Sequence, residues 1–233
     1  MNLRRVLILM AGLALVAGTA QAGTSNIFRF AGAAVNPTGD LTTRDSESIG
    51  LGDGTTMTIV DETTVDPDSA FGFCLDYEHR FSDRFGLGVT VMRSDHDLNA
   101  RGTGTIQVID DATGVVLLDM TVEAAARASV DMTPLLLGAN FHFPTGNNVD
   151  VYAGPFVGYV TYGDLVFEGE RTPLKSDVAY GGALGLDVPV GAGKMAISAA
   201  VRYMIASVEP DEPGSERLDA DPFTVSFGVG YKF

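Results

Sequence analysis

The clearest pattern in the chain is an unbroken alternation of apolar with small or polar residues over its final positions, 223 to 233. Side chains in a strand point to opposite faces in turn, so this period of two gives one apolar face and one small or polar face. A strand that crosses an outer membrane has this form and spans about 9–11 residues. The edge of a soluble sandwich rarely exposes so continuous an apolar face. The pattern therefore predicts a membrane-spanning strand, whose apolar face comprises Phe223, Val225, Phe227, Val229, Tyr231 and Phe233.

Seven upstream segments show the same alternation less cleanly, which makes eight predicted strands. The seven segments are 26–35, 71–81, 85–91, 135–143, 149–159, 180–190 and 195–207. The connections between successive strands are long and short in turn, as in barrels with short periplasmic turns and long extracellular loops. An even strand number places both termini on the periplasmic side. The sequence therefore predicts an all-β fold, an eight-stranded antiparallel up-and-down transmembrane β-barrel.

Four long connections are predicted to be extracellular loops: 36–68, 94–129, 163–176 and 208–221. The second contains a hairpin of its own, 105–122, which is predicted to extend the barrel wall outward. The first and fourth are rich in Asp and Glu, but no segment has the spacing of an EF-hand. These loops are predicted to be solvated, with cation-bridged contact to lipopolysaccharide phosphates as the alternative.

The N-terminus has the pattern of a secretory signal peptide. Arg4 and Arg5 precede an apolar run at 6–16 that is too short to span a bilayer, and 20–22 fits the A-x-A signal peptidase site. The sequence predicts a cleaved signal peptide at 1–22 and one barrel domain at 23–233, exported to the outer membrane of a Gram-negative bacterium. No later run reaches the ~18 apolar residues that a membrane helix needs, so strands must make any crossing.

Composition narrows the functional classes. The 28 glycines and the absence of tryptophan suit a glycine-rich β architecture, and the single Cys74 excludes an intramolecular disulfide. The formal net charge is −15, and it falls further when Arg4 and Arg5 leave with the signal peptide. Nucleic acid is excluded as a partner because its phosphates require Lys and Arg. Outer-membrane lipids and lipopolysaccharide are the expected surroundings, and no cofactor or metal is predicted.

Residues 29–37, RFAGAAVNP, place an arginine and a glycine before a short apolar run and Asn-Pro. They resemble the opening strand of the OmpW family of small outer-membrane barrels, which has this order and ends in Asn-Pro or Asp-Pro. Residues 134–143 and 151–159 are similar to its fourth and fifth strands, and 200–203 and 227–233 are similar to its seventh and eighth. The resemblance implies a narrow apolar channel that passes small hydrophobic molecules. The chain departs from the family in lacking tryptophan and in its long acidic first loop, which leaves the ligand open.

The terminal Phe233 resembles the signal that the outer-membrane assembly machinery reads in most such barrels. That machinery is therefore an expected partner.

Strand direction assigns each inward-facing polar residue to a level of the barrel. A ring of ~8 strands encloses a space that side chains can fill, so charges in its periplasmic half are predicted to pair across it and close it. An ion-selective path through the same charges is the alternative. The predicted network comprises Arg29, Glu78, Arg80, Asp187, Arg202 and Lys232, with His142 as a hydrogen-bonding neighbour.

Nearer the outside, the inward positions become apolar: Met92, Leu136, Phe156, Val160 and Met204. Apolar concave sites bind apolar ligands, so these residues are predicted to line a vestibule for a small hydrophobic molecule. Proline donates no hydrogen bond to a strand ladder, so a sideways exit into the bilayer is predicted near Pro134 or Pro155. A simple packed interior is the alternative.

One cluster, Ser94-Asp95-His96, brings a nucleophile close to a base, and Ser94 and His96 share a face of a strand. Such a trio arises often by chance, so the chain is not predicted to be an enzyme. Two functions remain open. One is a passive channel or binding protein for small hydrophobic molecules. The other is a structural or surface-interaction barrel with no transport role.

Overall fold

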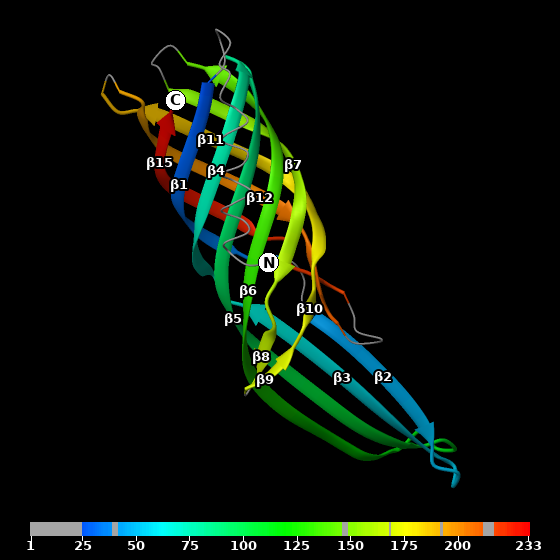
Figure 1. Ribbon diagram of the computed structural model, residues 1–233. Helices are drawn as coiled ribbons and strands as arrows, with labels where there is room; N and C mark the ends of the chain where they lie inside the picture. The colour runs from blue at the N-terminus through cyan, green and yellow to red at the C-terminus, as the bar shows by residue number, and fades with distance from the viewer. Residues whose placement is uncertain (1–24, 39–41, 146–148, 168, 192, 212–216) are drawn as a thin grey trace.

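The computed structural model describes residues 25–38, 42–145, 149–167, 169–191, 193–211 and 217–233. Eight strands close into a ring in which each pairs antiparallel with both neighbours (Figure 1). This confirms the predicted all-β, eight-stranded antiparallel up-and-down barrel; the predicted signal peptide lies outside the described residues. In ring order the strands are β1 (Ser25–Asn36), β4 (Ala70–Ser82), β5 (Phe85–Asp110), β6 (Val116–Pro144), β7 (Asp150–Tyr162), β11 (Asp177–Pro189), β12 (Met195–Ile205) and β15 (Phe223–Lys232).

Neighbouring barrel strands are joined by short turns at one end, which we call the periplasmic end, and by long connections at the other, which we call the outer end. No helix in the described part of the chain is long and apolar enough to cross a membrane.

The outward face of the ring carries exposed apolar side chains, with aromatic rings near both ends. At the periplasmic end the ring centroid of Phe85 lies 6.0 Å from that of Phe81 and 5.5 Å from that of Phe141. Such aromatic girdles mark the interfaces of a bilayer. At the outer end of β5 and β6 the apolar band gives way to charge, where Arg93 Nη2 lies 2.8 Å from Asp131 Oδ2. The membrane-spanning part of these two strands therefore stops near Arg93 and Asp131.

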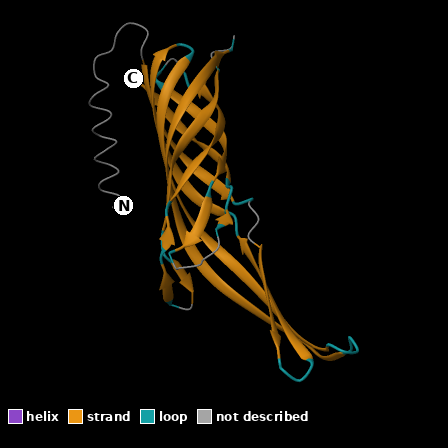
Figure 2. Ribbon diagram, turned by 90° about the vertical axis from the view of Figure 1, so that its right-hand side faces the viewer, coloured by secondary structure: helices purple, strands orange, loops and turns teal. Residues whose placement is uncertain are grey.

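A four-stranded sheet extends beyond the ring. The strands β2 (Thr42–Gly50) and β3 (Thr55–Pro67) form a hairpin that pairs with the outer half of β5, and the outer halves of β5 and β6 pair with each other. This projecting sheet leans to one side of the barrel (Figures 1 and 2). The predicted extension at 105–122 is confirmed. The segment 36–68 differs from the predicted loop, because β3 satisfies the backbone groups of β5 along the whole extension.

Short strands fold over the outer rim of the barrel. The strand β8 (Leu165–Phe167) pairs with β6 and with β9 (Glu170–Thr172). The strand β13 (Ser207–Pro210) pairs with β10 (Leu174–Lys175) and β14 (Leu218–Asp219). These strands bring two predicted loops together above the lumen.

Candidate functional site

The periplasmic half of the lumen is closed by buried ion pairs, which we call the lumen network. Glu78, only 1% exposed, accepts a 3.0 Å bond from Arg29 Nη1 on one carboxylate oxygen. Its other oxygen lies 2.6 Å from His142 Nε2 and 3.2 Å from Arg80 Nε. Arg29 also donates to Asp187 at 2.7 Å. Side chains from β1, β4, β6 and β11 thus meet across the barrel and exclude a wide aqueous pore.

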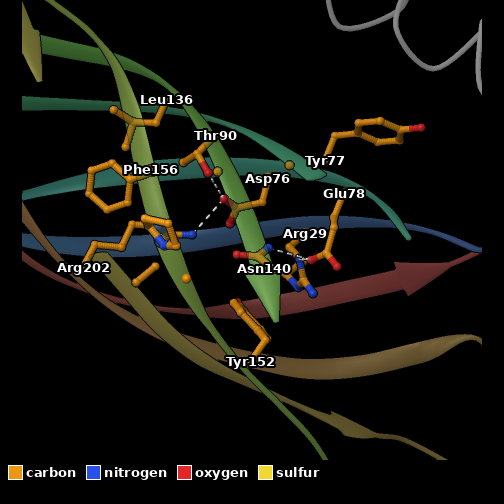
Figure 3. A pocket seen from close by; sticks show the side chains of 15 residues that line it. Arg29, Asp76, Tyr77, Glu78, Thr90, Leu136, Asn140, Tyr152, Phe156 and Arg202 are labelled. Carbon is orange, nitrogen blue, oxygen red and sulfur yellow. Dashed lines mark hydrogen bonds and ion pairs between the residues drawn. The ribbon is translucent and has the colours of Figure 1, made fainter. Parts of the chain in front are cut away.

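A second ion pair closes the lumen at mid-height. Arg202 Nη2 donates to Asp76 Oδ1 at 2.8 Å, and Thr90 donates to the same carboxylate (Figure 3). Between this pair and the lumen network lies a cavity of about 20 Å³, lined also by Leu136 and Phe156. That space holds about one water molecule.

Five of the six charged residues predicted to form the lumen network are buried in the lumen, and one is not. Arg29, Glu78, Arg80, Asp187 and Arg202 are buried in these two clusters. Lys232 instead is exposed and lines the periplasmic mouth, and in the described residues no ion pair joins it to the network. The reason is its position at the end of β15, where the side chain reaches the rim of the ring.

The five residues predicted to line a vestibule are packed against one another. They belong to one buried cluster, together with small side chains such as Cys74 and Ala31. They form a floor beneath an apolar opening at the outer end of the barrel, and none of them is among the residues that line that opening. The members of this floor that the sequence singled out are Met92, Leu136, Phe156, Val160 and Met204.

Above that floor lies an apolar cavity of about 140 Å³ at the outer mouth of the barrel, which we call the outer cavity. β5 and β6 supply its deeper wall together with Tyr162 of β7, and β3, the short strands and the prolines of the rim supply the rest. The alternation predicted for β5 ended at 91 and that for β6 began at 135, so Leu98, Val130 and Met132 were not assigned to the lumen and His96 was known only as part of a polar cluster. Continuing the same period would have placed all four on the inward face. The lining residues are Pro37, Val65, Pro67, His96, Leu98, Val130, Met132, Tyr162, Leu165, Leu174, Val208, Pro210, Leu218, Ala220 and Pro222.

Comparisons with known proteins agree with this architecture. A family model described as "Outer membrane protein beta-barrel domain" matches residues 8–233. The chain belongs to this family. It is therefore an outer-membrane β-barrel protein, and the outer membrane is its location.

Two solved structures share the fold of this outer-membrane barrel. The outer membrane protein OprG from Pseudomonas aeruginosa is 21% identical, with 91% of this chain and 97% of that chain covered and a TM-score of 0.60. Neisserial surface protein A is 13% identical, with 92% and 100% covered and a TM-score of 0.52. A comparison with curated proteins gave no match.

The polar pair Ser94 and His96 lies at the outer cavity of the barrel, beyond the membrane-spanning part of β5. His96 Nδ1 lies 3.2 Å from the backbone oxygen of Asp68, which only accepts hydrogen bonds, so Nδ1 carries the proton. His96 Nε2 then accepts from Ser94 Oγ at 2.9 Å. Asp95 points to the opposite face of the strand, toward Arg93, and adds no third group to the pair. The arrangement holds a neutral imidazole against an apolar space.

His96 should make the stability of the barrel depend on pH. Burial lowers its pKa, because an apolar setting disfavours the charged ring. The unfolded chain therefore takes up this proton at a higher pH than the folded barrel. The stabilisation is complete above the ordinary histidine pKa of about 6.5 and is lost as the pH falls below it. We expect His96→Gln to lose less stability than the wild type between pH 7 and pH 5 in urea unfolding; equal losses would contradict this assignment.

Tyr162 carries the only buried side-chain nitrogen or oxygen without a hydrogen-bond partner among the described residues. A buried hydroxyl without a partner loses about 1–3 kcal/mol of hydration. We therefore expect Tyr162→Phe to raise the free energy of unfolding by about 1 kcal/mol. Tyr159→Phe, on the same strand but facing outward, is the control and should change little. A destabilised Tyr162→Phe barrel would show that the hydroxyl has a partner.

Two prolines interrupt the ladders of β6. The β5–β6 pairing passes from Val91–Leu135 to Ser94–Met132, skipping Pro134. The β6–β7 pairing likewise skips Pro155. Near Pro155 the strands stay in contact, because a Cβ on Gly154 would lie 1.7 Å from the carbonyl oxygen of Ala139. The interruption at Pro134 lies between the outer cavity and the floor beneath it.

Proposed function

We propose that this outer-membrane barrel takes up small hydrophobic molecules through the outer cavity and passes them into the bilayer. The observation that carries the proposal is an apolar cavity that opens at the outer mouth above a lumen filled by ion pairs and packed side chains. An apolar cavity of about 150 Å³ in a protein stays dry and binds a ligand the size of benzene. A molecule held there has no polar path to the periplasm.

The exit we propose is sideways, between β5 and β6 at Pro134. Proline has no N–H to donate, and the ladder is interrupted beside the cavity wall at Met132. The resemblance to the OmpW family, to which we propose the chain belongs, supports the same route, because it implies a narrow apolar channel. The similarity of this chain to OprG in fold supports a small barrel of the same kind.

The test is ligand binding by the mature chain refolded in lipid nanodiscs. A small apolar fluorophore is titrated against the wild type, Val130→Lys and Ser129→Lys. Val130 lines the cavity, whereas the adjacent Ser129 is exposed, so the two variants carry the same charge on opposite faces. Saturable binding by the wild type and Ser129→Lys, lost in Val130→Lys, is the expected result.

A barrel that folds, as shown by heat-modifiable gel migration, and binds nothing would overturn uptake. That result would favour the surface-interaction role, for which the projecting sheet offers a surface outside the membrane.

A further inference from the structure

The projecting sheet has one apolar and one polar face. Strand pairing places Ile106 of β5 between Ile59 of β3 and Met120 of β6 on one face. The next residue along β5, Thr105, pairs with Val60 and Thr121 on the opposite face. On β5 and β6 the first face carries apolar or small residues along its length, while threonine, Gln and charged residues dominate the second face. An exposed apolar face of this extent, on the part of the protein outside the membrane, marks a binding site.

The apolar face is continuous with the outer cavity. Alternation along β5 carries the inward side of the barrel from His96 through Leu98 to Ala100 and on to Val108. Leu98 and Val65 belong both to the projecting sheet and to the lining of the cavity. At about 3.3 Å per residue, the apolar face runs about 33 Å outward from Leu98 to Val108. It is therefore an open extension of the same site.

Acidic side chains limit the width of this face. Asp61 of β3 pairs with Gly104 and with Asp45 of β2, so both carboxylates lie on the same face as the apolar residues. The apolar strip that continues along the sheet is therefore two strands wide and lies on β5 and β6, on the side away from β2. The strip consists of Leu98, Ala100, Gly102, Gly104, Ile106 and Val108 with Leu118, Met120, Val122, Ala124, Ala126 and Ala128.

The narrow width selects the occupant. Adjacent strands lie about 4.8 Å apart, so the strip accommodates one extended hydrocarbon chain. A stable protein partner needs about 1,000 Å² or more of total buried surface, which would cover the flanking acids. A second copy of this chain would also bring its own Asp45 and Asp61 to a surface that already carries them.

We propose that the apolar strip holds the tail of a linear long-chain aliphatic molecule whose other end occupies the outer cavity. This inference rests on the proposed function and names its ligand class: extended aliphatic chains longer than the cavity itself. Short molecules use the cavity alone, and each further methylene gains contact with the strip.

The experiment measures displacement of the cavity-bound fluorophore by primary alcohols of increasing chain length, from octan-1-ol to hexadecan-1-ol, in nanodiscs. The variants are Ala100→Glu, on the strip, and Thr105→Glu, on the opposite face of the same strand. Partition of the alcohols into lipid is equal for all three proteins, so it cancels in the comparison. Folding of each variant is checked by heat-modifiable migration.

We expect the affinity of the wild type and of Thr105→Glu to rise about twofold per methylene, because a half-buried methylene gains about half of its full transfer free energy. Ala100→Glu should bind octan-1-ol as the wild type does but bind hexadecan-1-ol at least about tenfold more weakly. A hexadecan-1-ol with a photoreactive diazirine at its far end should label the strip residues of β5 and β6.

The possible failures are distinct. If octan-1-ol and the fluorophore do not bind, the proposed function itself is overturned. If octan-1-ol binds but affinity does not rise with length, or rises equally in Ala100→Glu, the cavity stands and the strip is overturned as a tail site. Labelling confined to the opposite face, at Thr105 or Thr121, would overturn it too.

Discussion

Glu78→Ala is expected to lower the free energy of unfolding by about 3–5 kcal/mol, the cost of removing one partner from a buried ion pair. The glutamate serves Arg29, Arg80 and His142 at once, and each of these lies within a closed lumen. Without it Arg29 keeps Asp187 and Arg80 keeps Asp150, but both guanidinium groups and the His142 ring lose a buried hydrogen-bond acceptor. In a lumen without bulk water, the N–H groups left without that acceptor have no equivalent partner.

The measurement is urea unfolding of the refolded barrel in lipid vesicles, with Glu62→Ala as the control. Glu62 pairs with Arg44 at 4.0 Å on the exposed projecting sheet, and such a pair contributes at most about 1 kcal/mol. Equal effects of the two substitutions would show that the lumen network is hydrated and does not close the barrel.

Gly154→Ala is expected to lower the free energy of unfolding by about 3 kcal/mol or more, the second large effect that we predict. An added Cβ would lie 1.7 Å from the carbonyl oxygen of Ala139 and 2.8 Å from its carbon. These are backbone atoms of the neighbouring strand, so no side-chain rotation can relieve the clash. The strands β6 and β7 would have to separate at the place where the ladder is already interrupted.

Gly32→Ala is the matched control on β1, where an added Cβ meets no atom within 4 Å. We expect it to be neutral or slightly stabilising, because alanine restricts the unfolded chain. Folding yields and urea midpoints of the two variants make the comparison. A Gly154→Ala barrel as stable as the wild type would mean that β6 and β7 are separable there, and would place the lateral exit at Pro155 instead of Pro134.

The local sequence was sufficient to predict a strand wherever its two faces lie in different surroundings. Along β15, lipid on one side and lumen on the other impose a strict period of two, so the strand could be predicted almost to its last residue. The same period assigned Arg29 and Glu78 to the inside of the barrel, and the direction of their strands placed both in its periplasmic half. Which of the inward charges in that half pair with one another was decided by the tertiary structure, because Arg80 and Asp187 lie there too.

The alternation was lost where the two sides of a strand become more alike. Beyond Arg93, β5 leaves the bilayer and both of its faces can meet water, so polar and small residues enter both faces and the pattern weakens. The hairpin of β2 and β3 was therefore read as a loop, although it hydrogen-bonds to β5 along its length. The outer cavity was missed for the same reason.

The sequence by itself determined the barrel, its number of strands, the lipid-facing side of each strand and the charged half of the lumen, because these depend on periodicity and on direction along one chain. Only the tertiary structure decided that Met92, Leu136 and Phe156 fill the lumen instead of lining an opening. It also decided that the cavity lies one level higher, under strands contributed by two distant loops. Packing density and the folding of long connections depend on contacts between segments far apart in the chain, which no local pattern encodes.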